Sequence, residues 1–164
     1  MAPQRSLAAS AAGREPAADW RRGSSRLASA ARGKNDHVPV SIEEVRRLAL
    51  TLPRSTEHLI RDRVKFRVGR LVYVAFSRDE ALMGFGYPKE ERDALVGTRS
   101  EVFQLPRASD LRYNWVVARL DALDSGEMRE LVIDAWRMCV PKSVAANFDA
   151  LQAATDTLDV QWKP

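Results

Sequence analysis

The chain has 164 residues, of which 45% are hydrophobic and 29% charged, and its formal net charge is +4 at pH 7. This length predicts one domain built around one core. No run approaches the roughly 18 uninterrupted apolar residues of a membrane-spanning helix, and the single cysteine, Cys139, excludes an internal disulfide. We therefore expect a cytoplasmic protein with no membrane partner.

Residues 1–37 differ in composition from the rest of the chain. They are rich in Ala, Ser and Arg, and they carry seven basic and three acidic side chains. With almost no large aliphatic residue, this segment cannot bury enough surface to offset its ordering entropy, so we predict a disordered tail. A dispensable leader, or an upstream start codon chosen in error, fits better than a transit peptide, because Glu15 and Asp19 interrupt the basic residues. Of the 26 basic and 22 acidic residues, 19 of each remain beyond the tail, which therefore holds all of the excess positive charge.

The segment from 38 to 110 predicts two helices and four strands. Ser41 and Glu44 form a capping box for a helix that Pro53 stops. A polar loop containing His58 follows, and then Gly69 and Arg70 make a two-residue turn between strands at 64–68 and 71–76. We expect the remaining elements to be a strand at 81–85, a short helix from 88 to 97 and a strand at 102–105.

The segment from 111 to 142 predicts a strand followed by a helix. Residues 113–120 are rich in aromatic and β-branched side chains, which favours a strand. Asp124 and Glu127 then have capping-box spacing, and an apolar stripe that includes Trp136 continues to Pro141, which closes the helix. We place the domain at residues 38–146 and a C-terminal extension at 147–164.

The resulting order is helix, three strands, helix, two strands, helix. It predicts an α+β fold with two layers, in which helices back an antiparallel sheet. A colinear set of short segments extends over residues 41–146: Phe66 to Val68, Met83 to Phe85, Pro88 to Arg92, Asp110 to Trp115, Ala135 with Trp136, and Pro141 with Lys142. This set resembles the MmcQ/YjbR-like family, in an actinobacterial-type branch of this bacterial group. The resemblance implies the same element order, in a fold shared with secretion chaperones.

Catalytic and cofactor chemistry has little support in the sequence. His37, His58 and Cys139 lie far apart and lack metal-ligand spacing. Neither a nucleophile elbow nor a glycine-rich phosphate loop is present. We therefore expect a protein that is not an enzyme and that uses no cofactor or metal.

A run of basic residues gives the leading functional hypothesis. It consists of Arg61, Arg63, Lys65, Arg67 and Arg70. Within the first predicted hairpin strand, at 64–68, Lys65 and Arg67 alternate with apolar residues. One interpretation is a solvated or edge-protecting strand face, because charges on an edge strand block pairing with other chains. The other is a β wing whose side chains follow a phosphate backbone without reading its sequence. The family resemblance implies a double-wing DNA-binding motif, so we predict weak, sequence-nonspecific DNA binding.

A second candidate site is the segment Arg112, Tyr113, Asn114 and Trp115. An exposed aromatic beside Arg and Asn can stack on a base or close a small pocket, although a tryptophan in a strand is commonly a core residue. The rival function is therefore a small-molecule or protein-binding module that uses the groove between the sheet and the last helix. The sequence leaves the oligomeric state open.

Overall fold

The computed structural model describes the backbone of residues 38–161 and the side chains of residues 38–157. The predicted disordered tail and His37 lie outside the described residues. The helices and strands follow one another in the order α1 (Ile42–Thr51), β1 (Ser55–Ile60), β2 (Arg63–Val68), β3 (Leu71–Phe76), β4 (Leu82–Gly86), α2 (Lys89–Thr98), β5 (Phe103–Gln104), β6 (Trp115–Arg119), α3 (Ser125–Arg137) and α4 (Lys142–Gln161). Short 3₁₀ turns lie at Ala108–Asp110 and Leu120–Ala122. None of the described helices has both the length and the apolar character needed to cross a membrane.

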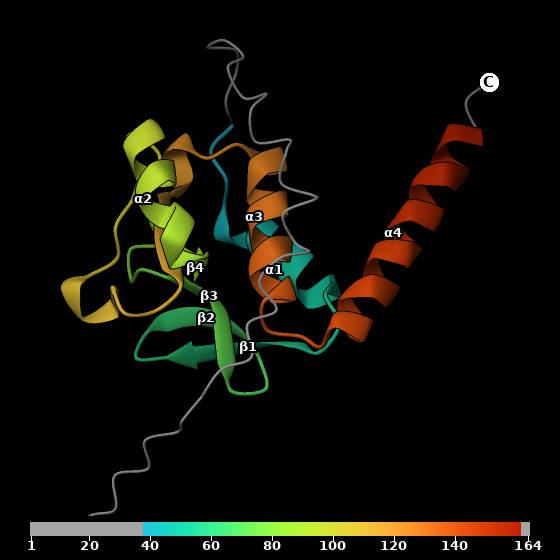
Figure 1. Ribbon diagram of the computed structural model, residues 1–164, viewed down its shortest axis with the longest axis horizontal. Helices are drawn as coiled ribbons and strands as arrows, with labels where there is room; N and C mark the ends of the chain where they lie inside the picture. The colour runs from blue at the N-terminus through green and yellow to red at the C-terminus, as the bar shows by residue number, and fades with distance from the viewer. Residues whose placement is uncertain (1–37, 162–164) are drawn as a thin grey trace, which may run out of the picture. The chain divides into compact units, whose positions relative to one another are not determined.

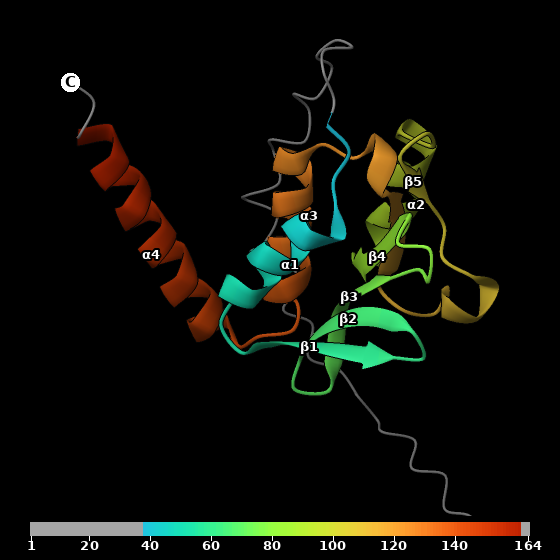
Figure 2. The ribbon, with the colours of Figure 1, turned by 180° about the vertical axis from the view of Figure 1, so that it is seen from behind.

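The strands form one antiparallel sheet in the order β1-β2-β3-β4-β6-β5. Helices α1 and α3 lie side by side in both views and contact strands β1, β3 and β4 (Figures 1 and 2). Helix α2 contacts β5 and β6, and Arg99 at its C-terminal end pairs with Glu127 of α3, so α2 belongs to the same layer. The predicted α+β fold with an antiparallel sheet backed by helices is confirmed.

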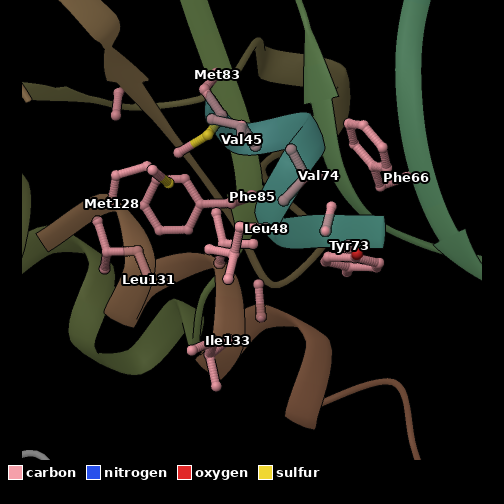
Figure 3. Close-up of a cluster of buried hydrophobic side chains, with 14 of the residues drawn as sticks. Val45, Leu48, Phe66, Tyr73, Val74, Met83, Phe85, Met128, Leu131 and Ile133 are labelled. Carbon is pink, nitrogen blue, oxygen red and sulfur yellow. The ribbon is translucent and has the colours of Figure 1, made fainter. Parts of the chain in front are cut away.

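The core lies between the sheet and this helix layer. Alternation along the strands turns Phe66, Val74 and Phe85 toward α1 and α3, where they meet Val45 and Leu131 (Figure 3). Trp136 of α3 is fully buried, and its Nε1 donates a 2.9 Å hydrogen bond to the backbone oxygen of Pro53. Because this bond satisfies the indole N–H, the largest side chain of the core leaves no unpaired donor.

The predicted helix starts at Ser41 and Asp124 are correct, although neither predicted capping box is complete in the described residues. The Ser41 hydroxyl accepts from the Glu44 amide at 3.3 Å, and the Asp124 carboxylate accepts from the amides of Gly126 and Glu127. The Glu127 carboxylate does not complete a capping box, because it pairs with Arg99 instead. This ion pair ties the N-terminal turn of α3 to the end of α2.

Strand β1 is the main departure from the predicted fold, because we expected a polar loop around His58. The strand pairs with β2 along its whole length, from Ser55 opposite Val68 to Ile60 opposite Arg63. A two-residue turn joins the strands, and both of its residues have positive φ, 53° at Arg61 and 59° at Asp62. Turns of this kind normally contain Asn or Gly, so the sequence carried no turn signal here.

Helix α4 also departs from the prediction. It runs through residue 146, so the expected boundary between domain and C-terminal extension falls inside a helix. Helix α3 ends at Arg137 with its C-cap at Met138, so the helix end predicted at Pro141 is too late. Pro141 instead begins α4, since its oxygen accepts from the amides of Val144 and Ala145. Proline suits the first turn of a helix as well as the end of one. Phe148 packs edge-on against Trp136, with 5.0 Å between ring centroids.

Candidate nucleic-acid interface

Three of the predicted basic residues form a line on the sheet face that the described helices leave uncovered. Arg63, Lys65 and Arg67 alternate along β2 with Val64, Phe66 and Val68, whose side chains contribute to the core. The three basic side chains therefore share the opposite face and stand about 7 Å apart along the strand. We call this uncovered surface the open face, and we call these three residues the basic strip.

The basic strip is not neutralised by neighbouring acids. Within residues 38–157, no carboxylate lies within ion-pair distance of Arg63, Lys65 or Arg67. Several other arginines of the domain do have acidic partners in this part of the chain: Arg46, Arg92, Arg99, Arg119 and Arg137. The three side chains are partly exposed, and the Nε of Arg67 is buried without a hydrogen-bond partner in the described domain. The positive charge of the strip is therefore not offset by a neighbouring carboxylate.

The surrounding segment adds to this positive charge. Residues 54–70 contain six Arg or Lys side chains but only two acidic ones, Glu57 and Asp62. The Glu57 carboxylate is held by Arg46 of α1, with 2.9 Å from Nε to the oxygen, on the helix side of the sheet. Because the chain beyond residue 37 has equal numbers of basic and acidic residues, the positive charge of this end is balanced by acids elsewhere in the domain.

Arg61 and Arg70 flank the strip but do not lie in it. Arg61 occupies the turn between β1 and β2, and Arg70 occupies the turn between β2 and β3, at opposite ends of β2. Gly69 has a φ of 58°, as the predicted hairpin turn requires. The five predicted residues thus extend along the whole of β2, with the strip between two basic turns.

The strand position of the basic strip corrects the edge-strand interpretation and the form of the predicted wing. Strand β2 lies between β1 and β3, so it is not an edge strand whose charges prevent aggregation. It is also not half of a free two-stranded wing, since β1, which we expected to be a loop, covers its outer side. The strip projects from the face of a sheet.

The second candidate, residues 112–115, divides into a structural part and an exposed part. The Asn114 side-chain oxygen accepts from the Lys89 amide at 3.3 Å, and its backbone oxygen accepts from the Tyr87 amide at 3.1 Å. Asn114 therefore supports the start of α2. Arg112 and Tyr113 are exposed, and the Arg112 guanidinium lies 4.7 Å from the Tyr113 ring centroid. The exposed part of this candidate is therefore the Arg112–Tyr113 cation–π pair, in which Asn114 takes no part.

Trp115 lies on the open face. It alternates with Val116, which is fully buried in the core, and its indole occupies the space directly above Gly84 of β4. A Cβ atom at Gly84 would lie 2.5 Å from the indole Nε1. Trp115 therefore points away from α3 and does not line the predicted groove between the sheet and the last helix.

Two hollows in the described domain also lie away from residues 112–115. One, of about 570 Å³, lies between α1 and the start of α3 and is bordered by Arg47 and Arg129. The other, of about 320 Å³, lies beside the turn between β3 and β4 and is bordered by Glu80 and Arg119. Neither hollow contains a residue of the two predicted sites.

Arg92 supports the second candidate, although the sequence analysis gave it no role. Its guanidinium is buried under the loop that precedes β6, and Nη1 donates to the backbone oxygens of Leu111, Tyr113 and Trp115 at 3.3 to 3.4 Å. A buried arginine usually needs such partners, and here its hydrogen bonds go to carbonyls, while the Asp93 carboxylate lies 3.8 Å from Nε. The side chain fixes the backbone that presents Tyr113 and Trp115.

Metal-binding and thiol chemistry have no organised site in the described domain. Across residues 38–157, no group of three His, Cys, Asp or Glu side chains converges as metal ligands. Burial raises the pKa of the Cys139 thiol to about 11, which disfavours the reactive thiolate at neutral pH.

The fold and the charge pattern define a small α+β domain with helices on one face of its sheet and a basic strip on the other. The family model named YjbR matches residues 50–138, which is more than half of the chain, so the protein belongs to the YjbR family. A similar fold is found in the crystal structure of Deinococcus radiodurans protein DR2400, whose domain is named DUF419. That likeness has a TM-score of 0.55 and 18% identity over 63% of this chain and 80% of the other. No curated protein matches the chain.

Proposed function

We propose that this YjbR-family protein is a non-enzymatic module that binds DNA weakly and without sequence preference through the basic strip. The observation that carries the proposal is the alignment of Arg63, Lys65 and Arg67 on one sheet face with no acidic partner in the described domain. Phosphate contacts from Arg and Lys supply most of the affinity of nonspecific nucleic-acid binding. They carry no sequence information of their own.

The geometry favours binding along β2 over binding at a single point. Consecutive basic side chains of the strip are separated by one strand residue, and Arg61 and Arg70 extend the row at both ends. A row of this kind can follow a polyanionic backbone over several phosphates. A small anionic ligand would instead need convergent donors in a hollow, and neither hollow described above includes the strip.

The test replaces Arg63, Lys65 and Arg67 together by Gln in the full chain. Fluorescence anisotropy with labelled DNA, used as a single strand and as a duplex of equal length, measures the affinity at low salt. We expect the affinity for DNA to fall by at least about tenfold, because three phosphate contacts are lost.

The matched control removes the same charge from the helix layer through Arg47→Gln, Arg129→Gln and Lys142→Gln. These side chains are exposed on α1, α3 and α4. We expect this variant to bind like the parent to within about threefold, since only the long-range potential changes. The proposal fails if the parent binds neither form of DNA, or if both triple variants lose affinity equally.

A further inference from the structure

The open face carries an apolar region beside the basic strip. The strand register places Lys65 of β2 opposite Ala75 of β3, Ala75 opposite Gly84 of β4, and Gly84 opposite Val117 of β6. Since neighbouring strands lie about 4.8 Å apart, Lys65 and Gly84 are separated by roughly 10 Å across the sheet. Only the methyl group of Ala75 stands between them.

The Trp115 indole packs against this region because Gly84 has no side chain that would occupy the same space. Three indole atoms, Nε1, Cε2 and Cζ2, lie within 2.9 Å of the position that a Cβ at Gly84 would occupy. The indole stays partly exposed, and its Nε1 has no hydrogen-bond partner within residues 38–157, unlike the Nε1 of Trp136. A large aromatic surface is therefore held against the sheet, beside the basic strip and open to solvent.

Arg92 fixes the position of Trp115 through a hydrogen bond to its backbone oxygen. The Arg92 Nη1 lies 3.4 Å from the Trp115 backbone oxygen, and it also donates to the backbone oxygens of Leu111 and Tyr113. A platform that is already ordered loses little entropy on binding a ligand. The aromatic ring and the basic strip therefore form one preorganised surface on the sheet.

The shape of this surface selects among forms of nucleic acid. The basic strip lies on an inner strand of a sheet that is six strands wide, so the surface spans roughly 24 Å. The major groove of duplex DNA is about 12 Å wide and admits a helix or a two-stranded ribbon, not the face of such a sheet. An unpaired strand can instead lie across the face and stack its bases on exposed aromatic side chains.

We propose that the open face binds single-stranded nucleic acid, with phosphates on the basic strip and an unpaired base stacked on Trp115. This inference rests on the proposed function and specifies its substrate class. Positive side chains and an aromatic platform about two strands apart supply the two complementary contacts that a single strand offers, its charge and its base faces. The contact is independent of base identity, because every base has a π face.

The test compares a thymidine oligonucleotide of about 12 nucleotides, within the usual range of single-strand site sizes, with a duplex of equal length. We expect the parent to bind the single strand more tightly. Trp115→Leu keeps an apolar cover over Gly84 and should weaken single-strand binding by roughly 5- to 100-fold, the range measured for loss of one stacked base. Duplex binding should change by less than about twofold, since phosphate contacts remain.

A second readout covers the case in which Trp115→Leu fails to fold. The oligonucleotide should quench part of the tryptophan emission of the parent, and Trp115→Phe should lose that quenching while retaining some affinity. The inference is overturned if quenching persists in Trp115→Phe, or if Trp115→Leu binds the single strand like the parent. If the stacking inference is overturned but the basic-strip variant still loses affinity for DNA, the proposed DNA-binding function is supported without base stacking on Trp115. If the parent binds no DNA at all, both proposals fail.

Discussion

Both terminal guanidinium nitrogens of Arg92 lie 3.3 Å from the backbone oxygen of Leu111. The side chain is 8% exposed, and its further bonds reach the oxygens of Tyr113 and Trp115. One arginine of α2 thus binds the backbone of the loop that leads into β6. The order of this loop, and with it the position of Trp115, depends on a residue that is distant in sequence.

Replacing Arg92 by Met should lower the free energy of unfolding by about 2 to 3 kcal/mol, because three backbone carbonyls lose charge-assisted hydrogen bonds. Urea unfolding measures this change, and amide exchange in residues 107–114 should become faster. Arg107→Met is the matched control, since Arg107 is exposed in the same loop and should change stability by less than about 0.5 kcal/mol. Equal stability of the two variants would show that Arg92 does not hold the loop.

Much of the fold could be predicted because its signals are local. Caps at Ser41 and Asp124, the Gly69 turn and the apolar stripe of α3 each act within a few residues. Strand β1 could not be predicted, because Glu57 faces the helix layer only by pairing with Arg46, eleven residues away. Its turn also uses Arg61 and Asp62 in a backbone conformation that normally selects Asn or Gly. Such a strand depends on tertiary contacts that residue pattern does not encode.

The sequence predicts which residues form the candidate site, but it does not predict how the sheet arranges them. Alternation with Val64, Phe66 and Val68 correctly separates the basic strip from the core. The sheet order, which makes β2 an inner strand, depends on β1 and was therefore missed. The roles of Arg92 and Asn114 arise from long-range contacts to backbone atoms, which leave no periodic signal in sequence.

Gly84→Ala tests the packing of Trp115 on the open face. The new methyl group would lie where the indole is now, so we expect a loss of about 1 to 3 kcal/mol in the free energy of unfolding. In a Trp115→Ala background the same change should be neutral or stabilising by up to about 1 kcal/mol, because only the unfolded-state entropy of glycine is removed. Thermal or urea unfolding of the four proteins measures the coupling. Additive effects would mean that the indole does not rest on Gly84.

Trp136→Ala should cost about 3 to 5 kcal/mol, as expected for a fully buried aromatic side chain. Trp136→Phe keeps most of the ring but leaves the Pro53 oxygen without its donor, so it should cost roughly 1 to 3 kcal/mol. Equilibrium unfolding in urea gives both values. Wild-type stability in the alanine variant would contradict the position of α3 in the core.

The folded protein should lose stability at alkaline pH, because Tyr73 is buried and its phenol must ionise there. Burial raises its pKa from 10.0 to about 12, although its hydroxyl contacts Ser55 at 2.5 Å. The folded state thus favours the neutral phenol, so this contribution is complete below pH 10 and is lost as pH rises toward 12. Across this window, stability should fall by about 2 to 3 kcal/mol more in the parent than in Tyr73→Phe. Both proteins retain Cys139, so thiol ionisation cancels in the comparison. Parallel pH profiles would contradict a buried Tyr73.

The salt dependence of DNA binding tests the central claim, that the basic strip contacts phosphates, most directly. Each phosphate contact contributes about 0.7 to the slope of log affinity against log salt for a single strand. The variant with Gln at positions 63, 65 and 67 should therefore show a slope shallower than the parent by about 2, whereas the helix-layer control should keep the parent slope. If the slope is unchanged when the strip is removed, the DNA contacts lie elsewhere on the protein and the account is wrong.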